Sequence, residues 1–195
     1  MTALVDRLFG LRFRGRLALG GLALFLLFWL VLFPRVAAEY ETPGEGMVRL
    51  QRAWDGAEFK SVLQDWSANN PRAPEIYKRD NLIKLDLLFP LVYSCYFAFA
   101  YAWARGVKTP AGRWDYFLFL APFCAALFDY FENGMHLYLL RGIDTGEQLR
   151  AAVFPDALVR LSALFTCVKF LFFGVGSVAY LVALFKRILS RKRQP

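Results

Sequence analysis

Cysteine and histidine are scarce in this sequence, which argues against a disulfide framework and against a thiolate zinc site. The 195 residues include three cysteines and a single histidine. Cys95, Cys124 and Cys167 form no C-x-x-C pair and fall within apolar runs, which favours packing roles over disulfides or a thiolate zinc site. The sequence also lacks an H-E-x-x-H pair, an internal repeat, a low-complexity tract and a strand pattern.

Apolar residues, by contrast, are abundant. The chain is 57% hydrophobic and 17% aromatic, and its mean hydropathy of +0.36 is too high for an ordinary soluble domain. A net charge of +8 could indicate nucleic-acid binding, but the basic residues form short clusters beside apolar runs instead of a continuous cationic surface. We therefore expect an integral membrane protein whose partner is the lipid bilayer, with no nucleic acid bound.

Four stretches are long and apolar enough to cross a bilayer, which takes about 20 helical residues. They lie near residues 17–37, 81–103, 116–140 and 159–185. The first stretch has a basic lead like that of a signal peptide, but its apolar run exceeds the usual signal core of roughly 7 to 15 residues, so we expect an uncleaved anchor. Residues 1–195 are thus predicted to form a single all-α membrane domain, a polytopic four-helix bundle.

Basic residues predict the orientation of these spans. One side of the membrane carries many Lys and Arg but only two acids, Asp6 and Asp115. The opposite side carries equal numbers of basic and acidic residues. Because short cytoplasmic segments are enriched in Lys and Arg, we expect a multi-pass protein of a bacterial inner membrane with both termini in the cytoplasm. The basic residues on that side are Arg7, Arg12, Arg14, Arg16, Arg105, Lys108, Arg113, Lys186, Arg187, Arg191, Lys192 and Arg193.

The first outer segment, residues 39–80, has a helical pattern of its own. Asp55 and Glu58 form a D-x-x-E capping arrangement, and apolar residues follow at amphipathic helical spacing. These apolar residues are Phe59, Val62, Leu63 and Trp66. In the second outer loop, Thr145 and Gln148 suggest a capping box for another short helix. We therefore expect a small helical extracytoplasmic cap.

Ionisable residues within the spans need an explanation, because each costs roughly 2.5 to 3.5 kcal/mol on insertion scales. Apart from basic residues near the span ends such as Lys84, which can snorkel at the outer boundary, the five are Asp86, Asp129, Glu132, His136 and Lys169. Three of them share one face of the third span with Asn133, since positions 129, 132, 133 and 136 cluster on a helical wheel. We expect this face to point into the bundle, where Asp86 and Tyr93 of the second span join it.

Depth arithmetic suggests a partner for the deepest acid. At about 1.5 Å per residue, Asp129 in the third span and Lys169 in the fourth lie at similar depths, about 16 and 15 Å below the outer surface. An ion pair between them is the simplest interpretation, and the acids and the lysine are then screened from hydrocarbon.

Several functions fit this polar core. It could bind a ligand, or a proton or ion, within the outer half of the bundle. Alternatively, carboxylates and imidazole from Asp86, Asp129, Glu132 and His136 could hold a divalent metal, as in a membrane hydrolase acting on a lipid-like substrate. It could also be a structural network in an adaptor protein. The basic C-terminal tail could bind anionic lipid. The oligomeric state stays open.

The chain as a whole resembles a set of uncharacterised bacterial four-span integral membrane proteins. The resemblance lies in the outer amphipathic helix ending at Trp66, the stretch from Leu85 to Pro90 followed by Tyr93, and the motif Asp129-x-x-Glu132-Asn133. It implies the four-span architecture and directs attention to Asp86, Asp129, Glu132 and Asn133. No activity is assigned to that set, so it implies none here.

Overall fold

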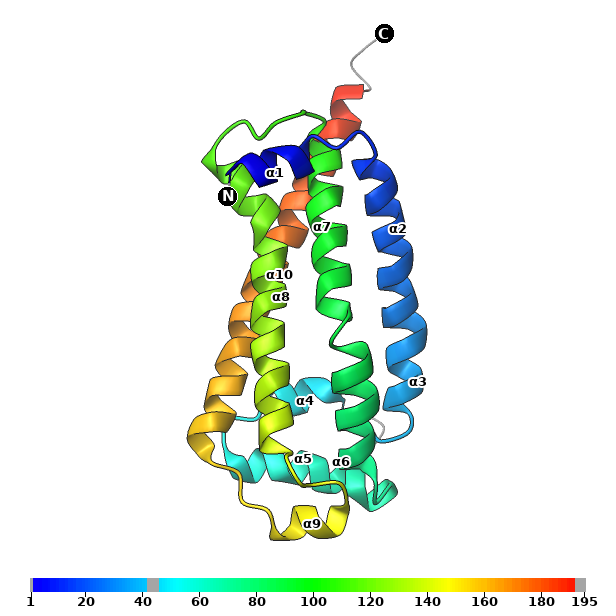
Figure 1. Cartoon of the computed structure of the whole chain (residues 1–195), viewed down its shortest axis with the longest axis vertical. Coiled ribbons are helices and arrows are strands. Elements are labelled where there is room, and N and C mark those ends of the chain that lie inside the picture. Colours follow the sequence, from blue (N-terminus) through cyan, green and yellow to red (C-terminus); the bar gives the residue numbers. More distant parts are fainter. Residues whose placement is uncertain (1, 42–45, 192–195) are drawn as a thin grey trace. The chain divides into compact units, whose positions relative to one another are not determined.

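The computed structural model describes residues 2–41 and 46–191 of the chain. The structure is all-helical, with 81% helix and no strand among the described residues (Figure 1). The helices are α1 (Thr2–Phe9), α2 (Arg14–Leu27), η1 (Phe28–Leu32), α3 (Phe33–Ala37), α4 (Met47–Arg52), α5 (Gly56–Asn69), α6 (Ala73–Ile76), η2 (Tyr77–Leu85), α7 (Phe89–Arg105), α8 (Arg113–Leu139), α9 (Gly146–Ala151) and α10 (Asp156–Arg191). The two η segments are π-helical turns, and α1 is a helix that the sequence pattern did not predict.

Three helical stretches among the described residues are long and apolar enough to cross a membrane. They are Arg14–Ala37, Ala73–Arg105 and Asp156–Ser190, with mean hydropathies of 2.4, 1.6 and 2.0 in their most apolar windows. Each contains one of the expected spans. The remaining expected span, 116–140, overlaps α8, which has 27 residues but whose second half carries Asp129, Glu132, Asn133 and His136.

The chain divides into two compact units. Unit 1 consists of Met1–Leu26, Pro90–Leu127 and Lys169–Pro195, and unit 2 of Leu27–Phe89 and Phe128–Val168. In each unit, segments far apart in sequence contribute to one core.

Unit 1 has its core around α1. Phe9 is fully buried and packs against Phe119 of α8 and Tyr101 of α7, with ring centroids 5.7 and 6.3 Å apart. The Tyr116 hydroxyl donates a hydrogen bond to the Asp6 carboxylate at 2.6 Å, which ties α8 to α1. The amphipathic α1 therefore covers the start of α8 instead of extending away from it.

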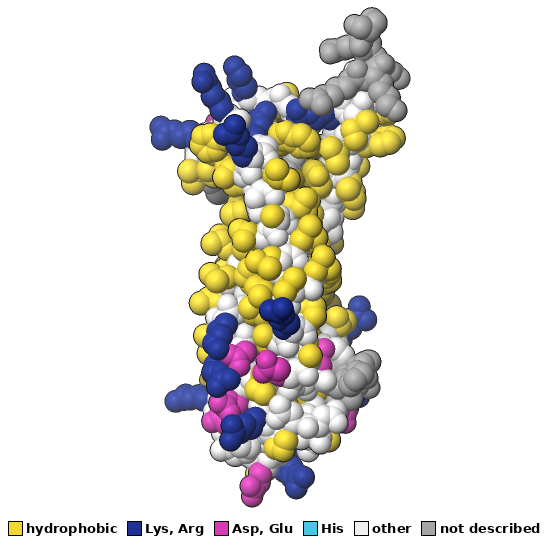
Figure 2. Space-filling model, turned by 90° about the vertical axis from the view of Figure 1, so that its right-hand side faces the viewer, with side chains coloured by type: hydrophobic (Ala, Val, Ile, Leu, Met, Phe, Trp, Pro, Cys, Tyr) yellow, Lys and Arg dark blue, Asp and Glu magenta, His cyan; other side chains and the backbone are white. Residues whose placement is uncertain are grey.

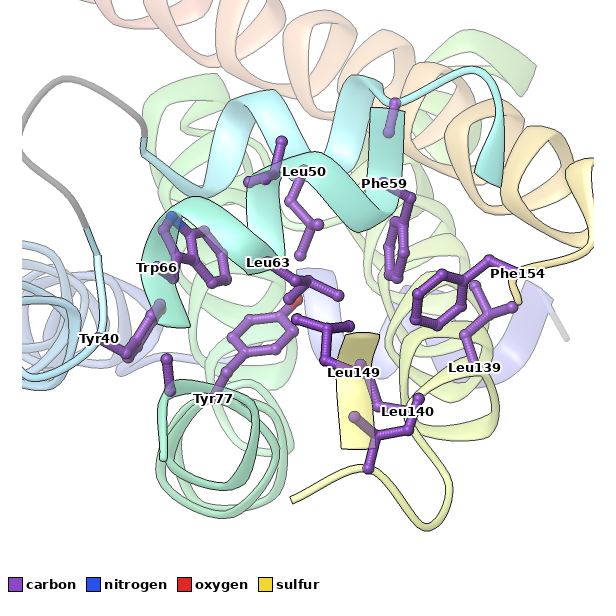
Figure 3. Packing of buried hydrophobic residues seen from close by; sticks show 14 of the residues in the cluster. Tyr40, Leu50, Phe59, Leu63, Trp66, Tyr77, Leu139, Leu140, Leu149 and Phe154 are labelled. Carbon is purple, nitrogen blue, oxygen red and sulfur yellow. The ribbon is translucent and has the colours of Figure 1, made fainter. Parts of the chain in front are cut away.

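Unit 2 has its core between α5 and the segments around it. The apolar face of α5 is buried and packs against Tyr40, Tyr77, Leu140, Leu149 and Phe154 (Figure 3). This confirms the amphipathic helix predicted from Phe59, Val62, Leu63 and Trp66. Burial of this aromatic face is the main source of stability for so short a helix.

Both predicted helix caps are present. The Asp55 carboxylate accepts a hydrogen bond from the Glu58 amide at 2.7 Å, while the Glu58 carboxylate accepts one from the Trp54 amide at 2.9 Å. Thr145 and Gln148 form the complete capping box of α9. These caps satisfy backbone amides that the first turn of a helix leaves without partners.

Charged side chains form two different kinds of group at the surface. On the face drawn in Figure 2, one group of charged side chains consists mainly of Lys and Arg, whereas another mixes acidic and basic side chains. Hydrophobic side chains cover much of the rest of this face. Lys192 and Arg193 of the basic tail lie outside the described residues.

Candidate functional site

The residues predicted to form the polar core fall in both units. Asp86, Asp129, Glu132, Asn133 and His136 belong to unit 2, and all five are buried. Tyr93 and Lys169 belong to unit 1 and are buried as well. Tyr93 packs edge-on against the Phe173 ring at 5.4 Å, and the Lys169 ammonium lies 5.1 Å from the centre of the Phe170 ring. The Asp129–Lys169 ion pair stays a prediction.

Asp86 lies at an interruption of the second candidate span. The π-helical η2 closes with a hydrogen bond from the Asp86 amide to the Asn81 carbonyl at 2.8 Å, and regular α-helix resumes at Phe89. Pro90 explains the interruption, because proline has no N–H for the carbonyl four residues earlier and its ring clashes with that carbonyl. The carbonyl in question is that of Asp86.

Side chains of α8 bind the carbonyls at this interruption. The Tyr130 hydroxyl donates to the Leu87 carbonyl at 2.9 Å, and the Asn133 amide donates to the Asp86 carbonyl at 3.4 Å. Tyr130 and Asn133 are three residues apart and therefore share a face of the helix. Irregular backbone within a membrane helix is tolerated where protein groups satisfy it in this way.

Two further residues of η2 complete the site, and sequence reasoning missed both. The Tyr77 hydroxyl lies 2.8 Å from Nδ1 of His136, and the Asn81 amide donates to the Asp86 carboxylate at 2.7 Å. Tyr77 and Asn81 are fully buried. A signal was present for Tyr77 and Asn81, which are four residues apart and share a helix face, but the expected span began only at Asn81 and so excluded Tyr77. Asp86 lies five residues after Asn81, a spacing that belongs to the π-helical turn and not to a regular α-helix.

Glu132 is the most deeply buried acid of this cluster, with an exposed fraction of 0%. His136, one turn further along α8, is 1% exposed. The Asn81 side-chain oxygen and the Ser162 hydroxyl are also buried in unit 2, and neither has a hydrogen-bond partner among the described residues. Buried acceptors usually have a donor, so these two oxygens could each accept a further hydrogen bond. Hereafter the polar cluster means Tyr77, Asn81, Asp86, Glu132, Asn133 and His136.

Aromatic side chains of α5 cover the polar cluster. Phe59 packs on the His136 ring with centroids 5.4 Å apart, and Trp66 packs on Tyr77 at 5.5 Å. Tyr40 contacts both Trp66 and Tyr77, at 4.9 and 5.6 Å. The buried face of α5 contains no titratable side chain, so this helix excludes water from the cluster without adding charge.

The metal site suggested by the sequence stays a prediction. Among residues 2–41 and 46–191, no three His, Cys, Asp or Glu side chains come close enough together to hold a metal ion. Asp86, Asp129, Glu132 and His136 were the proposed ligands. Two of them have neutral partners, since Nδ1 of His136 shares a hydrogen bond with the Tyr77 hydroxyl and Asp86 accepts one from the Asn81 amide.

Tyr40 and Glu41 border the cluster after α3. Burial raises the pKa of Tyr40 above its ordinary value, and nearby Glu41 and Asp86 raise it further. Burial also raises the pKa of Glu41, although a hydrogen bond from the Met47 amide at 2.9 Å opposes the shift.

The raised pKa of Glu41 predicts a pH effect on stability. An unfolded glutamate carboxyl has a pKa of about 4.3. Because the pKa of Glu41 is higher than this in the folded protein, the folded state binds the proton more tightly and is favoured at low pH. That contribution is lost as the pH rises through the folded pKa. We expect Glu41→Gln, which can still accept the Met47 hydrogen bond, to remove this part of the pH dependence of the melting temperature. A melting profile between pH 4 and 7 that is the same in both proteins would contradict the assignment.

The fold and the site define an all-helical protein with membrane-length helices and a buried, partly ionisable cluster beside an interrupted helix. Comparisons with models of known protein families, with curated proteins and with solved structures find no match. The chain's own geometry is therefore the basis for a functional proposal.

Proposed function

We propose that this chain is a four-span inner-membrane protein whose polar cluster takes up and releases a proton on the extracytoplasmic side. The four spans are Arg14–Ala37, Ala73–Arg105, α8 and α10, arranged as a bundle, and α4, α5 and α9 form the outer cap. Both termini lie in the cytoplasm.

The exposure pattern of α8 supports its assignment as a span. Its polar residues Glu132 and His136 are buried, while Leu127, Phe131 and Tyr138 are among its exposed side chains. A helix of 27 residues is about 40 Å long, which exceeds the ~30 Å hydrocarbon thickness of a bilayer. Apolar side chains outward and polar side chains inward are what a lipid environment requires.

Charge supports the orientation. Along the sequence, the residues before the first span, those between α7 and α8 and those at the end of α10 are rich in Lys and Arg, as cytoplasmic flanks are, whereas the segments 39–80 and 141–158 carry both signs of charge. With the basic segments inside, the segments 39–80 and 141–158, which contain α4, α5 and α9, are extracytoplasmic.

The complete burial of Glu132 beside His136 carries the proton proposal. Both side chains can gain or lose a proton, and a change of charge in a water-excluded site alters its free energy strongly. The titratable groups around them in unit 2 are Tyr40 and Glu41 after α3, Tyr77 of η2, Asp86 at the interruption, and Asp129 of α8. The side-chain oxygen of Asn81 could accept a hydrogen bond from a protonated neighbouring group.

The single histidine makes this proposal directly testable. In protein labelled with ¹⁵N-histidine and reconstituted into nanodiscs, one imidazole reports the state of the cluster. We expect its signals to titrate between pH 5 and 9, and Glu132→Gln to move the midpoint by about one pH unit or more. Glu147→Gln, an exposed acid of α9 in the same unit, is the matched control and should not move it.

Three other results would contradict the proton proposal or replace it with another function. If the midpoint is unchanged in Glu132→Gln while the melting temperature falls, the cluster is a structural network and the proposal is wrong. If Na⁺ at constant pH displaces the His136 signals and choline does not, the site binds a metal cation instead of a proton. A divalent metal retained by gently purified protein and lost in Glu132→Ala would restore the hydrolase alternative.

A further inference from the structure

A groove in unit 1 is separate from the polar cluster and has a different chemistry. It has a volume of about 740 Å³, within the range of about 300 to 1,000 Å³ typical of small-molecule sites. Side chains of α7, α8 and α10 line it, and all of them belong to unit 1. We call it the α10 groove, because that helix supplies most of its wall, from Phe170 to Lys186.

One end of the α10 groove is polar and positively charged. Asp115 is buried there and accepts hydrogen bonds from the Tyr101 hydroxyl at 2.5 Å and from Arg105 Nη2 at 3.0 Å. The Ala111 amide donates a third hydrogen bond to it, at 2.8 Å. Arg105 therefore neutralises this single carboxylate, and the exposed Lys186 adds a further positive charge.

The rest of the groove is apolar and open. Leu171, Val178 and Val182 line it and are exposed, so they face the surroundings of the protein. Gly174 also lines it, and a methyl group added there would meet no atom within 4 Å. Gly176 differs, because a methyl group there would lie 2.8 Å from the Pro122 ring. Glycine within a helix costs roughly 0.5 to 1 kcal/mol relative to alanine, and helix packing explains that cost at Gly176 but not at Gly174.

We propose that the α10 groove binds one anionic phospholipid from the membrane leaflet on the basic side. The phosphate lies at Lys186, whose charge Asp115 does not neutralise, and an acyl chain runs along α10 past Gly174. These two ends are separated by 12 residues, or about 18 Å, comparable with the ~15 Å hydrocarbon depth of one leaflet. Basic side chains at such an interface favour anionic headgroups.

The proposal requires only that α10 crosses the membrane, and it is independent of proton uptake by the polar cluster. A lipid is the occupant that the charge and the apolar wall together favour. Its phosphate matches the cationic end, and its hydrocarbon matches the exposed valine and leucine side chains. An apolar peptide helix from a protein partner would supply no negative charge for the ammonium group of Lys186.

Native mass spectrometry of the full chain in mild detergent tests this assignment. We expect phosphatidylglycerol to be retained in preference to phosphatidylcholine when both are supplied in equal amounts. Gly174→Phe should fill the groove and abolish this retention. Gly20→Phe is the matched control, because Gly20 of α2 also faces open space but does not line the groove. Lys186→Gln should reduce the preference for the anionic lipid about fivefold, while Lys108→Gln, an exposed cation outside the groove, should leave it unchanged.

Three results would overturn the proposal. Equal phosphatidylglycerol retention by Gly174→Phe and Gly20→Phe would mean that the lipid binds elsewhere. Equal retention of both lipids by the unmodified protein would mean non-selective solvation of an apolar surface. Dimers that dissociate only in Gly174→Phe would mean that the groove is a contact between two copies of the chain.

Discussion

Trp66→Ala is expected to lower the free energy of unfolding by about 3 to 5 kcal/mol, as the loss of a fully buried large aromatic side chain does in a well-packed core. Trp66 has an exposed fraction of 0%, and its ring packs against Tyr40 and Tyr77 (Figure 3). Since whole domains are stable by about 5 to 15 kcal/mol, this single change removes a large part of the total.

The substitution should also disturb the polar cluster. Trp66 supports the Tyr77 ring, and the Tyr77 hydroxyl lies 2.8 Å from Nδ1 of His136. Without the indole, the Tyr77 ring gains room to move and its contact with the imidazole weakens. The ¹⁵N signals of His136 should therefore shift under conditions in which the Trp66→Ala protein is still folded.

Trp54 provides the matched control for this experiment. Its side chain is 49% exposed, and its described hydrogen bonds are made by its backbone, to Glu58 and Arg160. Trp54→Ala should change stability by no more than about 0.5 kcal/mol. Both variants can be compared by denaturant titration followed by circular dichroism. If Trp66→Ala proves no more damaging than Trp54→Ala, the core of unit 2 is not organised around this indole.

Local sequence patterns predicted local structure well in this chain. The spacing from Phe59 to Trp66 and the capping pairs at Asp55 and Thr145 need only neighbouring residues, so α5 and α9 could be predicted. Apolar length likewise predicted the three candidate membrane spans. These features depend on one helix at a time.

The contacts of the polar cluster could not be predicted in the same way. Tyr77 and His136 are 59 residues apart, and their contact depends on how η2 and α8 are rotated as well as on their depth. The rise per residue gives the depth of a side chain along its helix, but not the direction in which the side chain points around the helix axis. The contacts of Asn81 with Asp86 and of Tyr77 with His136 therefore do not follow from depth alone.

Gly56→Ala should be strongly destabilising, although alanine normally favours a helix. A methyl group at Gly56 would lie 2.0 Å from the Phe154 carbonyl oxygen and 3.0 Å from the carbonyl carbon, and backbone atoms cannot move aside cheaply. The Gly56 amide also donates to the Asp156 carboxylate at 2.9 Å, so the start of α5 is held against the start of α10. We expect a loss of about 1 to 3 kcal/mol or more from this overpacking.

Gly134→Ala should have the opposite sign, which makes the pair a sensitive test. Gly134 lies within α8 in the same unit, and a methyl group there would meet no atom within 4 Å, so alanine should stabilise by roughly 0.5 to 1 kcal/mol. Hydrogen exchange adds a second measurement, because moving the start of α5 away from Phe154 should also loosen Phe59 over the His136 ring. The amides of α5 should therefore exchange faster in Gly56→Ala, whereas their exchange rates should be unchanged in Gly134→Ala. Equal stability and equal exchange in both variants would mean that α5 is not held against the chain at Phe154.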